Sequence, residues 1–160
     1  MPTVAPLDLD GHCVATAFLD DIPFFALADG MVHWLDHGQK SLKLHDGLLA
    51  ATTTAKNDLL VSGGEDGKVM SLNSTGTAEE LASAGRKWVT SVATGPQGAI
   101  AYASGRNAWV RFADGKVKEF VHPRSVEGVA FSPKGMRFGV ARYNGATLHF
   151  PATDGKPAEL

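Results

Sequence analysis

One segment of this chain occurs twice. The stretch VAFSPKGMRFGVA, from Val129 to Ala141, is preceded 37 residues earlier by the similar stretch VATGPQGAIAYAS, from Val92 to Ser104. Each stretch predicts two strands joined by a tight turn, because Pro fixes φ and Gly adopts a positive φ in the shared Pro-x-Gly. A period of this size is typical of repeat architectures, so the repeat constrains the fold more than any other feature.

The repeat extends over the whole chain. Four apolar segments, each followed by a turn glycine, begin 37, 40 and 38 residues apart: VHWL from residue 32, VMSL from 69, WVRF from 109 and TLHF from 147. Two strand-like segments precede each of them and a shorter one follows, which gives a unit of four strands. The one helix-like run, Thr77 to Gly85, falls at the fourth-strand position and is predicted to be a strand.

Four-stranded antiparallel units of this length are typical of β-propeller blades. We expect one all-β domain over residues 1–160, with the blades at residues 11–46, 47–83, 84–121 and 122–160. Residues 1–10 are similar to the segments that lead into the other blades, and we expect them to form a closing outer strand.

The repeats resemble those of the WD-repeat propeller family. LVSGGEDGKVMSL, residues 60–72, is similar to that family's second and third strands with their Asp-bearing turn, and VAFSPKG is similar to its first strand and turn. The third-strand Trp-Asp ending of the family is missing here. The resemblance implies a structural network that joins a His before the blade to a polar residue in the turn, with three pairs in this chain: His12 with Asp29, His45 with Asp66, and His122 with Asn144.

Closure of the propeller is a separate question. Propellers of the WD-repeat family usually have seven or eight blades, whereas this chain has four repeats and is similar to the N-terminal half of a bacterial WD-repeat protein about twice as long. An open arc exposes two blade faces, which favours association. We expect a half-propeller that closes by dimerisation or with a missing C-terminal half, and a self-contained ring of four blades is the competing possibility.

Composition limits the partners. With 44% hydrophobic and 20% charged residues, the chain can bury an ordinary core. A formal net charge of -2 provides no basic field for nucleic acid or anionic lipid. The sequence contains no leader pattern and no apolar stretch long enough to span a bilayer, and the single Cys13 excludes an internal disulfide. We expect a cytoplasmic protein that binds neither nucleic acid nor membrane.

No motif predicts catalysis or a metal site. Several His residues gather in the first repeat beside Cys13 and Asp36, but they lack a fixed ligand spacing, and we expect neither metal nor cofactor. Adjacent carboxylates such as Glu79-Glu80 point to opposite faces of a strand, which is a poor arrangement for acid-base chemistry. No Ser lies in a nucleophile-elbow motif. The sequence therefore predicts a protein that is not an enzyme.

A binding surface is the better-supported prediction. In a propeller, the turns between second and third strands share one face with the loops between blades. The repeat alignment assigns to this face Arg86, Lys87, Trp88, Arg106, Arg124, Arg142 and Tyr143. Arg, Trp and Tyr are enriched in interface hot spots, and Arg binds carboxylates through two hydrogen bonds. We predict a non-enzymatic scaffold for a protein or peptide partner of acidic character; the alternative is a small-molecule or metal site in the central channel.

Overall fold

The computed structural model describes residues 5–160, which form four antiparallel sheets of four strands each. Sheet 1 contains β1 (Cys13–Leu19), β2 (Ile22–Leu27), β3 (Met31–Leu35) and β4 (Gln39–Lys43). Sheet 2 contains β5 (Leu48–Thr53), β6 (Leu59–Gly64), β7 (Lys68–Asn73) and β8 (Ala78–Ser83). Sheet 3 contains β9 (Ser91–Thr94), β10 (Ile100–Ser104), β11 (Asn107–Arg111) and β12 (Val117–Val121). Sheet 4 contains β13 (Val126–Phe131), β14 (Phe138–Arg142), β15 (Gly145–His149) and β16 (Ala158–Glu159).

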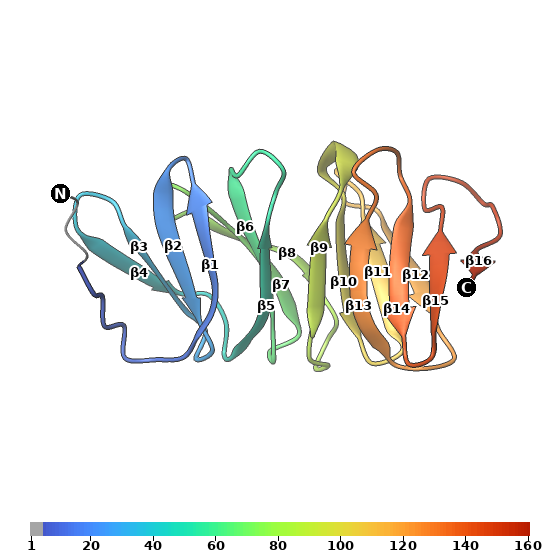
Figure 1. Ribbon diagram of the computed structural model, residues 1–160, viewed down its shortest axis with the longest axis horizontal. Coiled ribbons are helices and arrows are strands. Elements are labelled where there is room, and N and C mark those ends of the chain that lie inside the picture. Colours follow the sequence, from blue (N-terminus) through green and yellow to red (C-terminus); the bar gives the residue numbers. More distant parts are fainter. Residues whose placement is uncertain (1–4) are drawn as a thin grey trace.

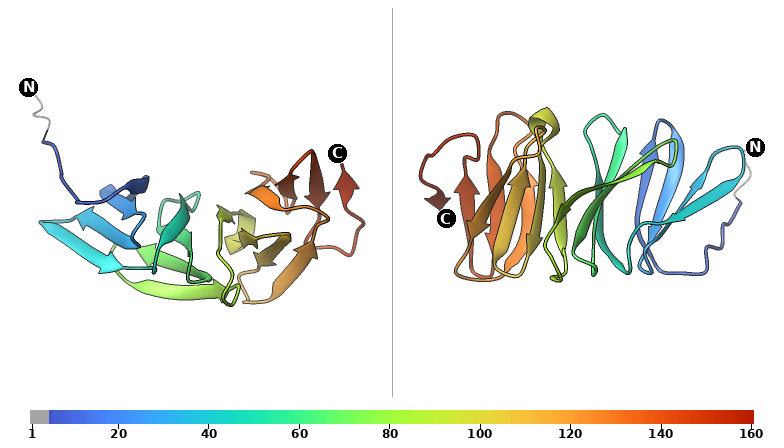
Figure 2. Two further views of the ribbon diagram at one scale, coloured as in Figure 1. Left: turned by 90° about the horizontal axis from the view of Figure 1, so that it is seen from below. Right: turned by 180° about the vertical axis from the view of Figure 1, so that it is seen from behind.

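The four sheets stand side by side along an arc (Figures 1 and 2). The first strands of successive sheets contact one another, β1 with β5, β5 with β9 and β9 with β13. The other strands follow in chain order away from this inner row, which is the geometry of propeller blades. The two ends of the arc do not meet (Figure 2, left). The predicted all-β half-propeller is confirmed.

The helix-like run from Thr77 to Gly85 forms strand β8, as predicted. Residues 5–12 form no strand, and the remainder of the expected closing strand lies outside the described residues. The outer edge of β15 is already paired with β16, which the chain's own last residues provide. Within residues 5–160, no helix is long and apolar enough to cross a bilayer.

Three hydrophobic clusters lie between the sheets. Leu60 and Leu72 of sheet 2 pack with Phe24 and Trp34 of sheet 1. A second cluster joins sheets 2 and 3, and a third joins sheets 3 and 4 around Phe138. Alternate residues of a strand point to opposite faces, so each inner sheet contributes to two clusters. The core of this protein is therefore a row of interfaces between sheets.

A substitution at the interface between sheets 3 and 4 tests this arrangement of the core. Phe138 is fully buried, with its ring centroid 5.9 Å from that of Phe120 on β12 of sheet 3. We expect Phe138→Ala to lower the free energy of unfolding by about 3–5 kcal/mol, measured by urea denaturation. Val121→Ala, at a position 67% exposed, is the control and should change it by less than about 0.5 kcal/mol. Equal effects of the two changes would contradict this assignment of the core.

Candidate functional site

The predicted binding residues lie along one edge of the arc, which we call the loop edge. This edge carries the turns between second and third strands and the loops between sheets, at the bottom of Figure 1. Arg86, Lys87 and Trp88 lie in the loop between β8 and β9, and Arg106 lies in the turn between β10 and β11. Arg124 lies in the loop between β12 and β13, Arg142 ends β14, and Tyr143 begins the turn that follows.

Backbone hydrogen bonds hold these loops against the turns of the preceding sheet. Val89 N donates to Gly64 O at 3.0 Å, His122 N donates to Arg106 O at 2.9 Å, and Val126 N donates to Gly105 O at 2.8 Å. Arg124 and Arg106 are therefore carried by backbone segments in direct contact. Most of the predicted residues are exposed: Arg86, Lys87, Arg106, Arg124, Trp88 at 55% and Tyr143 at 71%.

Arg142 differs from the other arginines of the set. Its side chain is only 12% exposed and forms an ion pair with Glu159. The guanidinium also donates to Ala146 O at 3.2 Å. A guanidinium already paired with a carboxylate is not free to bind another, so Arg142 is removed from the candidate binding surface and assigned to the attachment of β16.

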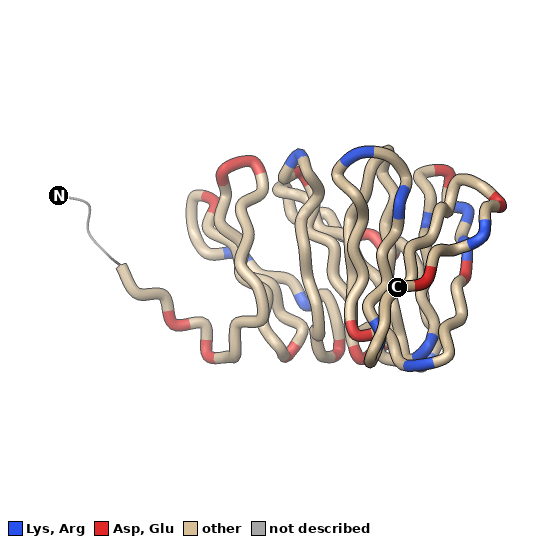
Figure 3. The backbone as a smooth tube through the Cα atoms, turned by 45° about the vertical axis from the view of Figure 1, so that its right-hand side comes forward, with Lys and Arg blue, Asp and Glu red and all other residues tan. Residues whose placement is uncertain are grey.

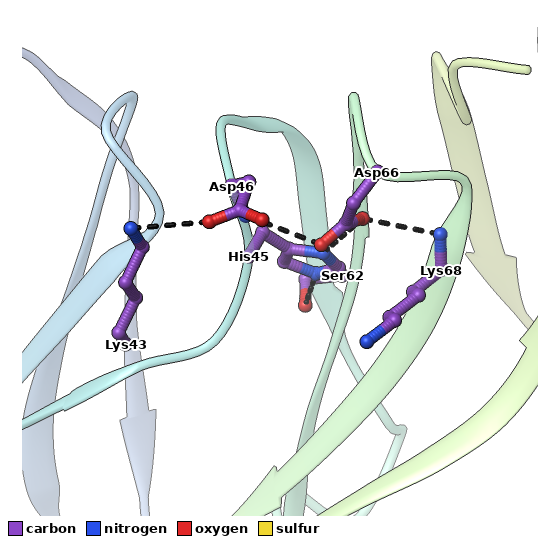
Figure 4. Close-up of polar contacts among 6 residues, drawn as sticks. All are labelled: Lys43, His45, Asp46, Ser62, Asp66 and Lys68. Atoms are coloured by element: carbon purple, nitrogen blue, oxygen red, sulfur yellow. Dashed lines mark hydrogen bonds and ion pairs between the residues drawn. The ribbon is translucent and has the colours of Figure 1, made fainter. Parts of the chain in front are cut away.

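A polar network occupies the loop edge at sheet 2, where His45 lies between Asp66 and Ser62 (Figure 4). His45 Nδ1 is 3.0 Å from Asp66 Oδ1, and His45 Nε2 is 2.8 Å from Ser62 Oγ. Asp66 also accepts hydrogen bonds from the backbone N–H groups of Asp46 and Lys68, both at 3.1 Å. An ionised carboxylate can only accept, so Nδ1 carries a proton that it donates to Asp66.

The network depends on a close backbone approach and on a favourable charge. A Cβ at Gly64 would lie 2.4 Å from His45 Nδ1, so only glycine leaves room for the imidazole. Burial, the largest effect on Asp66, raises its pKa, but the hydrogen bonds from His45, Lys68 and Asp46 together lower the pKa below its usual value. The carboxylate of Asp66 is thus held in its charged form. Its hydrogen bonds tie the loop between β4 and β5 to the turn between β6 and β7.

Asp66, His45 and Ser62 have the order of a hydrolase triad, yet their burial argues against catalysis. Ser62 is fully buried and His45 is 2% exposed, so no substrate can reach the hydroxyl. The sequence pattern predicts His45 and Asp66 as members of this network but not Ser62. Ser62 lies on the second strand of the repeat that carries Asp66, and this position could have suggested it. The sequence does not show which face of the sheet Ser62 occupies, because that depends on the pairing between strands. We interpret the triad as a structural network.

The other two expected pairs do not form hydrogen bonds within the described residues. His12 is exposed and Asp29 instead accepts from the Met31 N–H at 2.9 Å. No sheet precedes β1 in the described chain, so no turn carbonyl holds the segment of His12 as Gly30 O holds His45 N. In sheet 4 the turn has two residues, Tyr143 and Asn144, instead of the three of sheet 2, and His122 takes another partner.

That partner is a second buried histidine. His122 Nε2 lies 2.9 Å from His149 Nε2, and His122 Nδ1 lies 3.3 Å from Arg106 O. The carbonyl can only accept, so His122 donates through Nδ1 and accepts from His149. Burial lowers the pKa of both histidines, and burial together with the neighbouring His122 lowers the pKa of His149 to about 4. Both rings are therefore neutral at pH 7.

The remaining candidate features carry no chemistry that the structure brings together. Among residues 5–160, no group of three or more His, Cys, Asp or Glu side chains could hold a metal ion. His33 on β3 is near Gln39 at 3.4 Å and His37 in the β3–β4 turn is beside Asp36, whereas His45 lies in the loop between β4 and β5. On the channel side, a cavity of about 460 Å³ between β1 and β5 is lined by Ala, Thr, Phe, Asn and Leu without an ionisable group.

Comparison with known proteins supports the fold. No protein-family model matches the chain, and no curated protein matches its sequence. The chain is similar to one chain of a solved structure described as "Crystal Structure of Mitotic Checkpoint Complex", with a TM-score of 0.69 and 15% sequence identity. The match covers 85% of this chain and 47% of that chain, so this chain spans about half the length of the structure it matches. Similarity at this identity shows a β-propeller fold and leaves WD-repeat membership a prediction.

Removal of the Asp66 carboxylate tests the structural network. Asp66→Ala leaves His45 Nδ1 and two backbone N–H groups without their acceptor. We expect the free energy of unfolding to fall by about 2–3 kcal/mol in chemical denaturation. Asp29→Ala is the matched control, because Asp29 accepts one backbone N–H and should cost less than about 1 kcal/mol. A loss for Asp66→Ala no larger than for Asp29→Ala would show that the network does not stabilise the loop.

The His122 and His149 pair predicts a loss of stability in acid. Because the pKa of His149 falls from 6.5 to about 4 on folding, the unfolded chain binds more protons between these values. Stability is fully present above pH 6.5 and declines as the pH falls toward 4, by on the order of 3 kcal/mol for this group. His149→Gln should flatten the decline, measured by urea denaturation at several pH values, whereas His37→Gln at an exposed position should not. An unchanged pH profile in His149→Gln would contradict the assignment.

Proposed function

We propose that this chain is a non-enzymatic propeller scaffold that binds an acidic segment of a partner protein at its loop edge. One observation carries the proposal. Four exposed cations, Arg86, Lys87, Arg106 and Arg124, come from neighbouring loops and turns of this edge, and none of them forms an ion pair within residues 5–160. In Figure 3, basic segments lie on the lower edge toward the C-terminal sheets.

The aromatic side chains on the same edge support a protein partner. Trp88 follows Arg86 and Lys87 in one loop, and Tyr143 lies in the turn of sheet 4, both more than half exposed. Large aromatic side chains supply contact area beside charged groups at binding hot spots, and Arg forms paired hydrogen bonds with carboxylates. The solved structure of the same fold belongs to a protein complex, which supports a role in protein association.

The proposal involves no cofactor and no catalytic group. Ser62 and His45, which have the composition of a catalytic site, are buried inside a sheet interface. The channel cavity has no ionisable lining, so nothing favours a metal or small-molecule site there over the loop edge. A free, exposed Cys13 supports the expected cytoplasmic location. The scaffold also associates with itself through the open ends of the arc.

Charge reversal tests the loop edge. We expect a fluorescent peptide of Glu, Asp and Tyr residues to bind the wild type more weakly as salt rises, and Arg106→Glu with Arg124→Glu to weaken binding by about tenfold or more in fluorescence anisotropy. Lys56→Glu with Lys116→Glu, on the opposite edge, is the matched control and should leave the affinity unchanged.

Two results would contradict the proposal. The first is that the loop-edge variant binds the peptide as tightly as the wild type does, while the two proteins unfold at the same temperature. The second is binding of a single-stranded oligonucleotide as tightly as the acidic peptide, since this would reassign the cations to phosphate recognition.

A further inference from the structure

The end sheets of the arc each have one face that packs against no other sheet of the described chain. On sheet 1, cross-strand pairs put Thr16, Phe25 and His33 on one row, with Phe18 opposite Pro23 beside it. These residues alternate with Ala17, Phe24 and Trp34, which face sheet 2. Phe18 is 62% exposed and the neighbouring Leu35 is 38% exposed. The open face of sheet 1 therefore presents bulky apolar side chains.

The open face of sheet 4 has the opposite character. Its residues are small: Gly128, Ala130, Gly139, Ala141 and Ala146, together with Leu148. They line a groove of about 420 Å³, together with Leu160. A Cβ added at Gly128 would meet no atom within 4 Å, so the groove has room for side chains from outside the chain.

Two interfaces inside the arc show the same pairing of small with bulky faces. Between sheets 3 and 4, Ala101, Ala103 and Ala108 pack against Phe138 of the next sheet. Between sheets 2 and 3, Val61 and Val69 pack against Tyr102 and Trp109, and a Cβ at Gly63 would lie 2.5 Å from Val89. In both cases the face toward the next sheet is small and the face toward the previous sheet is bulky. Between sheets 1 and 2 both faces are bulky, with Phe24 and Trp34 of sheet 1 against Leu60 of sheet 2. The two open faces of the chain have the small-to-bulky order of the former two interfaces.

Charges at the edge opposite the loop edge add to the complementarity. The β1–β2 turn carries Asp20 and Asp21, and the β13–β14 turn carries Lys134 and Arg137. In Figure 3 the upper edge is acidic toward the N-terminal end and basic over sheet 4. Turns of neighbouring sheets touch at this edge, as Asp20 N donates to Asn57 O at 3.3 Å. A sheet 1 that follows sheet 4 would bring the aspartates beside the cations.

We infer that a second copy of this chain closes the propeller head to tail, with Phe18 and Phe25 of each copy seated in the groove that Gly128 lines on the other. Two copies of four sheets then form one ring about a two-fold axis, and both open ends are covered. The match of this chain to about half of a longer propeller chain agrees with this count. The inference rests on the proposed scaffold function and names one of its partners.

Light scattering after size exclusion measures the association directly. We expect the wild type to have the mass of two chains, and Phe18→Asp and Gly128→Trp each to have the mass of one at the same concentration. Both changes are at positions open to solvent in the single chain, so its fold should persist in circular dichroism. Val121→Asp, at a position 67% exposed on β12, is the matched control and should remain a dimer. A monomeric wild type, or a dimer that either variant leaves intact, would overturn the inference.

Mixing the two variants tests the head-to-tail arrangement. Each variant alone damages both interfaces of the ring. In a mixture, the intact sheet 4 face of Phe18→Asp meets the intact sheet 1 face of Gly128→Trp, so mixed dimers should form. Two sheet 1 faces in symmetrical contact would instead leave Gly128→Trp dimeric by itself, and that result would falsify head-to-tail closure.

The acidic peptide separates this inference from the proposed function. Phe18→Asp should bind the peptide through Arg106 and Arg124, which lie on the loop edge away from the mutated face. Peptide binding by a monomeric wild type would overturn the closure alone. Dimerisation as expected without peptide binding would overturn the acidic partner alone.

Discussion

The central constraint on this protein is that a four-stranded sheet with two apolar faces must cover both of them. Sheets 2 and 3 do so with neighbours on each side, and the clusters around Leu60, Tyr102 and Phe138 are the result. An isolated sheet would expose both apolar faces to water, which the hydrophobic effect opposes. The arc, the inner row of first strands and the exposed end faces all follow from this stacking.

The loops between sheets carry polar groups into the interfaces, where each needs a partner. The chain meets this need in two ways. In sheet 2 a three-residue turn places Asp66 within reach of His45, whereas the shorter turn of sheet 4 leaves His122 to bond His149. Both solutions use residues that could support chemistry elsewhere, but burial converts them into structural links. The candidate binding surfaces are therefore those whose side chains are exposed to solvent.

Two kinds of surface remain exposed, and they differ in character. The loop edge carries exposed cations and aromatic side chains on backbone segments held by hydrogen bonds to the preceding sheet. The end faces are apolar, one bulky and one small, and they lie at the two ends of the arc (Figure 2). A charged edge is typical of transient interfaces with polar partners, whereas apolar sheet faces are typical of permanent interfaces. One small arc thus exposes two surfaces of different chemical character.

The sequence by itself determined the four-strand repeat and the order of its strands, even where a run such as Thr77 to Gly85 has helical composition. It also predicted an outer strand over residues 1–10, and residues 5–12 form none. Alternation and turn residues act over a few positions, so they can be read locally. The tertiary structure alone decided which side chains meet. Arg142 is withdrawn from the loop edge by Glu159, and Ser62 joins His45, because strands distant in the chain are paired in space. Likewise, His12 has no counterpart of the His45–Asp66 hydrogen bond within residues 5–160, because that contact requires a preceding sheet to hold the loop.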